Sequence, residues 1–167
     1  MVNRPEIITD RLVMKALNRE ELMFLHSGNL SGFRRARGWP SAHLVEALPH
    51  FINDLQDDPT LLGWGVWGII HRNSRELIGD VGLKGAPDEN GVVEIGYSMS
   101  IPYRGKGYTI EAVNALIEWA FRDERVTTVI AECDDSNRIS KRVLESVGMD
   151  FTNKSGKATY WKLNRKK

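Results

Sequence analysis

The residues best suited to chemistry form a short glycine turn, Arg104-Gly105-Lys106-Gly107-Tyr108. The turn lies between a strand pattern and a strong amphipathic helix pattern. The first backbone N–H groups of a helix lack partners and carry partial positive charge, so they bind phosphate oxygens well. The two glycines leave room for a phosphate, while Arg104 and Lys106 add positive charge. The turn therefore predicts a pyrophosphate site; a glycine turn that merely connects a strand to a helix is the alternative.

Two other phosphate-binding motifs do not match this turn. A P-loop needs Lys and then Ser or Thr after its second glycine, but Tyr108 follows Gly107. A dinucleotide fingerprint needs a third Gly or Ala, and Ile110 occupies that place. The turn also follows the fourth strand pattern instead of the first, so neither nucleotide motif explains it.

The elements that must position this turn are read from hydrophobic periodicity and turn signals. Asn18 and Ser41 are candidate caps for two of the helices, and the segment Asp134-Asp135-Ser136-Asn137 supplies cap candidates for a third. The expected order is β-α-α-β-β-β-α-β-α-β-β. The strands are expected at residues 7–17, 64–71, 76–83, 92–99, 126–133, 151–152 and 159–163. The helices are expected from the Asn18 cap to about residue 26, from the Ser41 cap through the apolar residues 44–55, from the glycine turn through the apolar residues 113–121, and from the 134–137 segment to Gly148.

Composition limits the class of protein. The 167 residues, 41% of them hydrophobic, suit one domain over residues 1–167. Lys plus Arg number 23 and Asp plus Glu number 22, so the charge of +1 does not favour nucleic acid as a partner. No run approaches the roughly 20 apolar residues of a membrane span. The single cysteine, Cys133, cannot form an internal disulfide, which favours a cytoplasmic location.

No metal site is expected. The four histidines show no ligand spacing, so surface or core positions suit them better. Trp39 is a weak candidate for lining a pocket, because aromatic residues more often serve packing.

A longer stretch around the turn resembles a known motif. Residues 94–112, EIGYSMSIPYRGKGYTIEA, look like motif A of the GNAT acetyltransferase superfamily, and residues 8–12 and 137–149 are similar to its RimJ/RimL-like branch. That branch acetylates ribosomal-protein N-termini or small amines. The likeness touches nearly the whole chain and is weakest at residues 27–59. Thr109 replaces the motif's final small residue, Met149 replaces a common Phe, and Leu144 excludes a tyrosine acid at that position.

The resemblance implies a fold and a cosubstrate. The fold is α/β, with a GNAT-like, mostly antiparallel mixed sheet of about seven strands, flanking helices and a split between the fourth and fifth strands. The cosubstrate is acetyl-CoA. Its pantetheine arm would meet backbone groups of Met99 and Ile101 and the side chain of Asn137. Its pyrophosphate would meet Arg104, Gly105, Lys106, Gly107, Tyr108 and Thr109.

Acetyl transfer to an amine requires a group that takes the amine's proton, since a free amine is mostly protonated at neutral pH. Glu94 is the first candidate, because Gly96 and Ser98 on the same strand face leave room for a ligand. Glu132 matches the base position of another GNAT branch and is the second. Ser140, which matches the branch's serine, would assist the departing thiolate. Each of these residues has an ordinary alternative: a solvated carboxylate, or a serine in the first turn of a helix.

The function implied by the resemblance is direct acetyl transfer from acetyl-CoA to a primary amine, on a peptide or protein N-terminus or a small molecule. The alternative is a non-catalytic CoA-binding regulatory domain of the same fold. A homodimer is a further expectation, and neither nucleic acid nor a membrane is expected as a partner.

Overall fold

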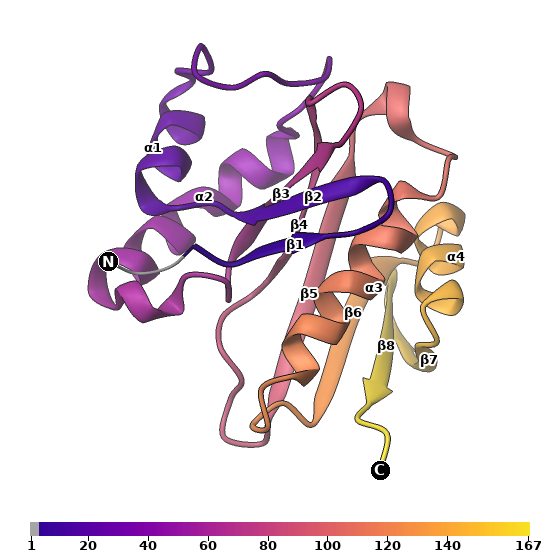
Figure 1. Ribbon diagram of the computed structural model, residues 1–167. Helices are drawn as coiled ribbons and strands as arrows, with labels where there is room; N and C mark the ends of the chain where they lie inside the picture. Colours follow the sequence, from indigo (N-terminus) through magenta and orange to yellow (C-terminus); the bar gives the residue numbers. More distant parts are fainter. Residues whose placement is uncertain (1–3) are drawn as a thin grey trace.

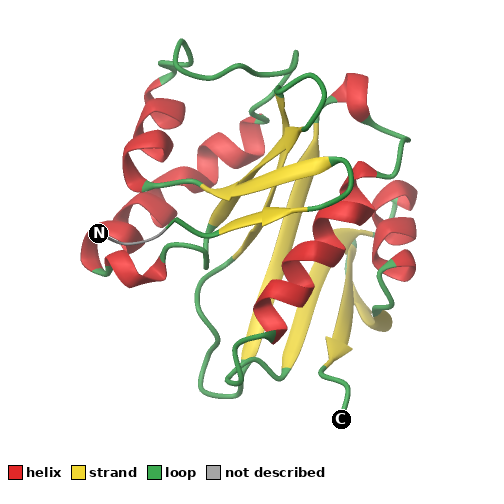
Figure 2. Cartoon of the chain, in the orientation of Figure 1, coloured by secondary structure: helices red, strands yellow, loops and turns green. Residues whose placement is uncertain are grey.

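The computed structural model describes residues 4–167 and contains one eight-stranded sheet in the order β1-β2-β3-β4-β5-β6-β8-β7. All neighbouring strands are antiparallel except β5 and β6, which are parallel. Helices flank the sheet (Figure 2). The strands are β1 (Glu6–Ile8), β2 (Leu12–Ala16), β3 (Val66–His71), β4 (Leu77–Leu83), β5 (Val92–Met99), β6 (Thr128–Asp134), β7 (Asp150–Ser155) and β8 (Ala158–Asn164).

Two pairs of helices cover opposite faces of the sheet. Successive strand residues point to opposite faces, and on β3 the buried Val66 packs in the core of the α1–α2 side while Trp67 packs in the core beneath α3. Figure 1 shows α1 and α2 together at the left, and α3 and α4 together at the right. The helices are α1 (Arg19–Ser27), α2 (Ala42–Asp57), α3 (Tyr108–Phe121) and α4 (Arg138–Ser146), with short 3-10 turns at η1 (Pro59–Leu61) and η2 (Ile101–Tyr103).

The expectation of one strand over residues 7–17 is wrong. The chain turns back at Thr9–Arg11, and β1 pairs with β2 through Ile8 and Val13. The turn contains no glycine or proline; its Thr9 N–H donates to the Leu12 carbonyl at 2.9 Å, and the Thr9 hydroxyl accepts from the Leu12 N–H at 3.1 Å. Because this side-chain turn has no strong sequence signal, the sheet has one strand more than expected.

The predicted helix caps are confirmed. Asn18 and Glu21 form a capping box at the start of α1. Ser41 and Asn137 accept backbone N–H groups at the starts of α2 and α4. These local hydrogen bonds fix where the helices begin, independently of the distant parts of the fold.

The predicted split between the fourth and fifth expected strands is confirmed and lies between β5 and β6. These strands pair only from Val92–Glu94 to Thr128–Ile130, after which β5 follows β4 and β6 follows β8. In an antiparallel ladder, every second residue of a strand bonds through its backbone to the neighbouring strand. On β5 these residues are Glu94 and every second residue after it, because the Glu94 carbonyl accepts from the Lys84 N–H at 2.9 Å. The backbone groups of Tyr97 and Met99 therefore point away from β4, into the split.

Within residues 4–167, none of the helices combines the length and apolar character needed to cross a bilayer.

Candidate active site

A cavity of about 270 Å³ lies where β5 and β6 separate. Its lining includes Gly96 and Ser98 from one face of β5, and Ile95 and Tyr97 from the other. Because alternate strand residues point to opposite faces, the cavity passes through the sheet at the split. A ligand entering from the α3–α4 side can thus meet a ligand entering from the α2 side.

The glycine turn has the backbone geometry that requires glycine. Gly105 has φ of 74° and Gly107 has φ of 82°, in the left-handed region that other residues avoid. Gly107 is also the N-cap of α3, and no side chain caps this helix. An added Cβ at Gly105 would have no atom within 4 Å. The turn is therefore open, and the first N–H groups of α3 at Tyr108 and Thr109 are left for a ligand.

The two basic side chains of the turn bond to the backbone just before it. Arg104 Nε donates to the Met99 carbonyl at 2.8 Å, and Lys106 Nζ donates to the Pro102 carbonyl at 2.9 Å. Ile101 lies in the 3-10 turn η2, past the end of β5, and its carbonyl accepts from the Arg104 N–H at 3.2 Å. Arg104 and Lys106, whose charges were predicted to bind phosphate, therefore lie at the turn and also stabilise its backbone conformation.

The turn is held from the side by the β1–β2 turn, a role that the sequence reasoning missed. Glu111 in the first turn of α3 accepts from the Arg11 Nε at 2.7 Å, the Arg11 N–H at 2.9 Å and the Thr9 hydroxyl at 2.6 Å. Arg11 Nη1 also donates to the Lys106 carbonyl at 2.9 Å. Burial opposes ionisation of Glu111, but these hydrogen bonds outweigh it, so the pKa of Glu111 is lowered. The resemblance of residues 8–12 to the RimJ/RimL-like branch was the sequence signal for this contact, but it did not reveal that Thr9 and Arg11 hold Glu111.

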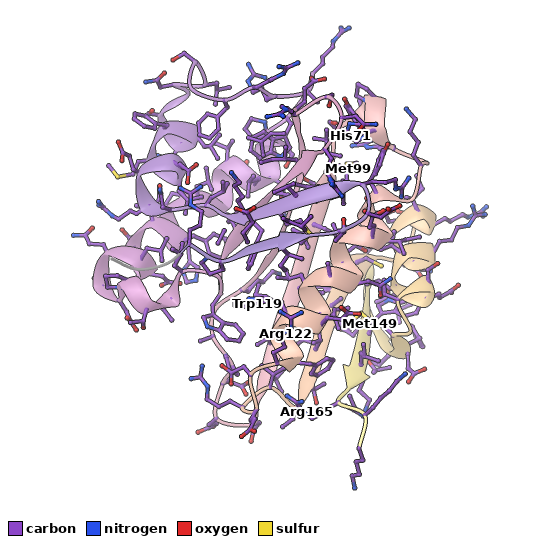
Figure 3. The ribbon with its side chains drawn as sticks, viewed as in Figure 1. His71, Met99, Trp119, Arg122, Met149 and Arg165 are labelled. Atoms are coloured by element: carbon purple, nitrogen blue, oxygen red, sulfur yellow. The ribbon has the colours of Figure 1, made fainter. Side chains whose placement is uncertain are left out.

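An aromatic cluster supports the other side of the turn. The Tyr108 hydroxyl lies 3.0 Å from His71 Nε2, and His71 Nδ1 lies 3.0 Å from the Ser74 hydroxyl. Ser74 in turn lies 3.2 Å from the Tyr103 hydroxyl. Figure 3 shows His71 at the same end of the sheet as Met99, the last residue of β5 before η2 and the turn. The β3–β4 hairpin therefore fixes both tyrosines that flank the glycines.

Ser140 forms a hydroxyl pair with Tyr97 across the split. Ser140 Oγ lies 2.5 Å from the Tyr97 hydroxyl, and both residues line the cavity. The Ser140 N–H donates to Asn137 Oδ1 at 3.0 Å, so the Asn137 side chain serves as the N-cap of α4. Burial raises the pKa of Tyr97 to about 12, although its hydrogen bond with Ser140 opposes the shift. Sequence reasoning identified Ser140 and Asn137 but not Tyr97.

The two glutamates expected as bases occupy different surroundings. Glu94 forms an ion pair with Lys84, and its side chain is outside the lining of the cavity. Glu132 on β6 is exposed and lines the cavity. The structure therefore brings Glu132, Ser140 and Asn137 together around one space and leaves Glu94 beside it.

Another carboxylate that lines the cavity, Asp80 on β4, was missed. It is 8% exposed, and its Oδ1 accepts from Trp39 Nε1 at 2.9 Å and from the Ser98 hydroxyl at 2.5 Å. Burial raises the pKa of the Asp80 carboxyl above its usual range, and the hydrogen bonds from Ser98 and Trp39 offset this only in part. The sequence signal was a lone carboxylate within the apolar and glycine run of residues 77–83.

Trp39 and Cys133 are buried residues that pack within the fold. Trp39 is 2% exposed and holds Asp80 from behind; it is not among the residues that line the cavity. Cys133 is buried at the end of β6, with its sulfur 3.2 Å from the Thr159 hydroxyl. In the part of the chain from residue 4 onward, no three His, Cys, Asp or Glu side chains gather as a metal site would require.

Comparison with known proteins gives consistent matches over this fold. A sequence profile described as "Acetyltransferase (GNAT) domain" matches residues 11–150. The uncharacterized N-acetyltransferase YjdG of Bacillus subtilis (strain 168) is 35% identical over 130 residues, which cover 78% of this chain and 77% of that protein.

Two solved structures are similar at low sequence identity. RimL, a ribosomal L7/L12 alpha-N-protein acetyltransferase in complex with coenzyme A, is 16% identical with a TM-score of 0.69, over 96% of this chain and 98% of that one. A ribosomal-protein-S5-alanine acetyltransferase from Vibrio fischeri is 16% identical with a TM-score of 0.69, over 96% of each chain. At this identity the two structures show a shared fold.

Proposed function

The chain belongs to the GNAT acetyltransferase family and is an acyltransferase, and we propose that it moves the acetyl group of acetyl-CoA directly to a primary amine. The observation that carries this proposal is the cavity at the β5–β6 split, which joins the side of the glycine turn to the α2 side of the sheet. Such a passage lets two substrates approach the same point from opposite faces.

The pyrophosphate of acetyl-CoA would bind at the glycine turn. The open backbone from Gly105 to Thr109 supplies N–H groups at the uncapped start of α3, and Arg104 and Lys106 add positive charge. The structurally similar RimL was solved in complex with coenzyme A, which supports coenzyme A as the ligand of this turn.

The pantetheine arm would lie in the split. The Tyr97 and Met99 backbone groups point into it, in the way that a free sheet edge accepts an extended ligand. The Met99 carbonyl already accepts from Arg104, so its N–H is the group available to the arm. Ile101, in η2, would contact the arm where it leaves the split. Asn137 contributes by fixing Ser140 at the start of α4.

The chemical step joins the amine nitrogen to the carbonyl carbon of the thioester and breaks the carbon–sulfur bond. The amine gives up a proton to a carboxylate of the cavity, and the thiolate that leaves accepts a hydrogen bond or a proton from the Ser140 and Tyr97 hydroxyls. Glu132 is exposed at the cavity, so it is suited to passing the proton to solvent. Glu94, engaged by Lys84, is assigned a smaller contribution.

The acceptor is an amine on a peptide or protein N-terminus, or on a small molecule. The names of RimL and of the S5-alanine enzyme favour a peptide amine, whereas the cavity volume of about 270 Å³ favours a small one. A cytoplasmic location and a homodimer remain predictions from the sequence.

A ligand panel tests this function. We expect thermal stabilisation of the full chain by acetyl-CoA and CoA but not by NAD or ATP, followed by release of free thiol when acetyl-CoA is mixed with suitable primary amines. Equal stabilisation by all four ligands would contradict the CoA site. Stabilisation by CoA with no thiol release on any amine would instead indicate the non-catalytic CoA-binding alternative.

A further inference from the structure

We propose that Asp80, on the α2 side of the cavity, binds the ammonium group of the acceptor and takes its proton, and that the acceptor is a small primary amine carrying an apolar alkyl or aryl group. This inference rests on the proposed acetyl transfer. It names a carboxylate that the sequence motifs do not indicate.

The hydrogen bonds of Asp80 leave one oxygen for a ligand. Both protein donors, Trp39 Nε1 and the Ser98 hydroxyl, bond to Oδ1. Within residues 4–167, no hydrogen bond reaches Oδ2, although the residue is 8% exposed and lines the cavity. Oδ2 is not among the fully buried polar atoms that lack a partner, so it is accessible from the cavity and free to accept a hydrogen bond from a ligand there. An ammonium group can donate that hydrogen bond.

Burial of Asp80 explains how an ammonium becomes a nucleophile. Two opposite charges in a buried site attract each other, but each also loses its hydration. When one proton moves from nitrogen to the carboxylate, both groups become neutral, and burial favours the neutral forms. The result is a protonated Asp80 beside a free amine, whose lone pair can attack the thioester carbonyl.

The space next to Asp80 reaches the place where the thioester would lie. Gly96 is on the same face of β5 as Ser98, and an added Cβ at Gly96 would meet no atom within 4 Å. Tyr97, between these two residues, bonds to Ser140 from the opposite face. The amine held by Asp80 and the hydroxyls that would assist the thiolate are therefore on the two sides of one strand, at the edge of the split.

The residues that line the cavity determine which group can be attached to the ammonium of the acceptor. Leu44, Ala47 and Phe51 of α2 present apolar surface to the cavity, opposite the strand that carries Asp80. Burial of apolar surface would stabilise an alkyl or aryl group there. Lys84, Glu132 and Asp134 also line the cavity, but Lys84 is paired with Glu94, so the apolar wall of α2 is the feature that selects the acceptor.

Asp80→Asn is the sharpest variant. The amide oxygen of Asn can keep both hydrogen bonds made by Oδ1, while its NH₂ group replaces the free Oδ2. Asp150→Asn, at an exposed position on β7, is the matched control. The binding probes are 2-phenylethylamine and its neutral analogue 2-phenylethanol, titrated calorimetrically into the full chain saturated with CoA. Turnover is measured by thiol release with 2-phenylethylamine, 1,4-diaminobutane and an alanyl peptide.

We expect the wild type and Asp150→Asn to bind the amine at least about 10-fold more tightly than the alcohol, and Asp80→Asn to lose that preference. In Asp80→Asn, kcat/KM should fall by about 100-fold or more, as for loss of a general base, with unchanged CoA affinity. A variant that keeps both the preference and the turnover would overturn the role of Asp80. A higher kcat/KM for the diamine or the peptide would overturn the apolar acceptor.

The two proposals fail in different ways. If no amine is acetylated by the wild type while amine binding still depends on Asp80, the proposed function is wrong and the binding site stands. If acetylation proceeds equally well without the Asp80 carboxylate, the function stands and this inference is wrong.

Discussion

The Tyr97 hydroxyl lies 2.5 Å from Ser140 Oγ and joins β5 to the first turn of α4 across the split. Burial raises the pKa of Tyr97 to about 12, so the phenol keeps its proton at neutral pH and remains a donor. The two hydroxyls line the same cavity and share a short hydrogen bond. We therefore expect them to act on the departing thiolate as one unit.

Removing either hydroxyl should slow the transfer step. Ser140→Ala and Tyr97→Phe should each lower kcat by about 10- to 100-fold, the range expected for one hydrogen bond to a charged group. The double variant should lose little more than either single one, because the groups are coupled. Steady-state kinetics with CoA affinity measured in parallel checks this. Losses that multiply would show that the two hydroxyls act separately.

Valine at Gly107 should weaken CoA binding. The residue has φ of 82°, which a β-branched side chain tolerates poorly, and an added Cβ would lie 3.3 Å from Arg11 Nη2, so the new side chain would disturb the contact of Arg11 with the turn that forms the proposed phosphate site. Gly28→Val is the matched control, since Gly28 has φ of 80° and open space around it. Both variants should lose stability, but only Gly107→Val should lose CoA affinity, by about 10-fold or more. Calorimetric titration with CoA separates the two effects, and equal affinities would contradict the phosphate site.

The Glu111 carboxylate should stabilise the fold in a pH-dependent way. Its pKa is lowered in the folded protein, because hydrogen bonds from Thr9 and Arg11 outweigh the effect of burial. A lowered pKa gives stability that is fully present above the unfolded value, near 4.5, and is lost as the pH falls through the folded value. Glu111→Gln should therefore have a lower Tm than the wild type at pH 7, and the difference should shrink below about pH 4. A difference that is constant with pH would exclude the charge as its cause.

Asp80 should have the opposite effect on stability. Its pKa is raised by burial, so the stability that it contributes is present below the unfolded pKa and is lost as the pH rises through the folded pKa. At pH 7 the carboxyl of Asp80 is ionised in the unfolded chain, whereas burial disfavours its ionisation in the folded protein, so Asp80→Asn should have a higher Tm than the wild type. The gain should disappear near pH 4. Asp150→Asn, whose residue is exposed, should show no such gain. A lower Tm for Asp80→Asn at pH 7 would contradict the cost of the buried charge.

The two glutamates expected from the sequence should differ in their effect on turnover. Glu132→Gln should lower kcat by about 10-fold, because Glu132 lines the cavity and is proposed to pass the proton to solvent. Glu94→Gln should lower kcat less, because Lys84 engages this side chain beside the cavity. The measurement is the pH profile of thiol release for both variants. A larger loss for Glu94→Gln would return the role of base to that residue.

Features that depend on neighbours in the sequence were predicted well. The N-caps Asn18, Ser41 and Asn137 and the strand at 92–99 were confirmed, and both glycines of the turn adopt positive φ. The split in the sheet was also confirmed, from resemblance. The turn at Thr9–Arg11 was not predicted, because a threonine side chain and a distant glutamate stabilise it instead of glycine or proline.

The sequence by itself determined the local chemistry of this protein, since backbone conformation, caps and helix dipoles depend on residues a few positions apart. Only the tertiary structure decided which side chains share the cavity. Tyr97 meets Ser140 from 43 positions away, and Trp39 meets Asp80 from 41. Burial of Asp80 and the pairing of Glu94 with Lys84 likewise follow from how β4, β5 and α2 pack. Such contacts depend on the whole fold, and they set the charge and hydration of each group.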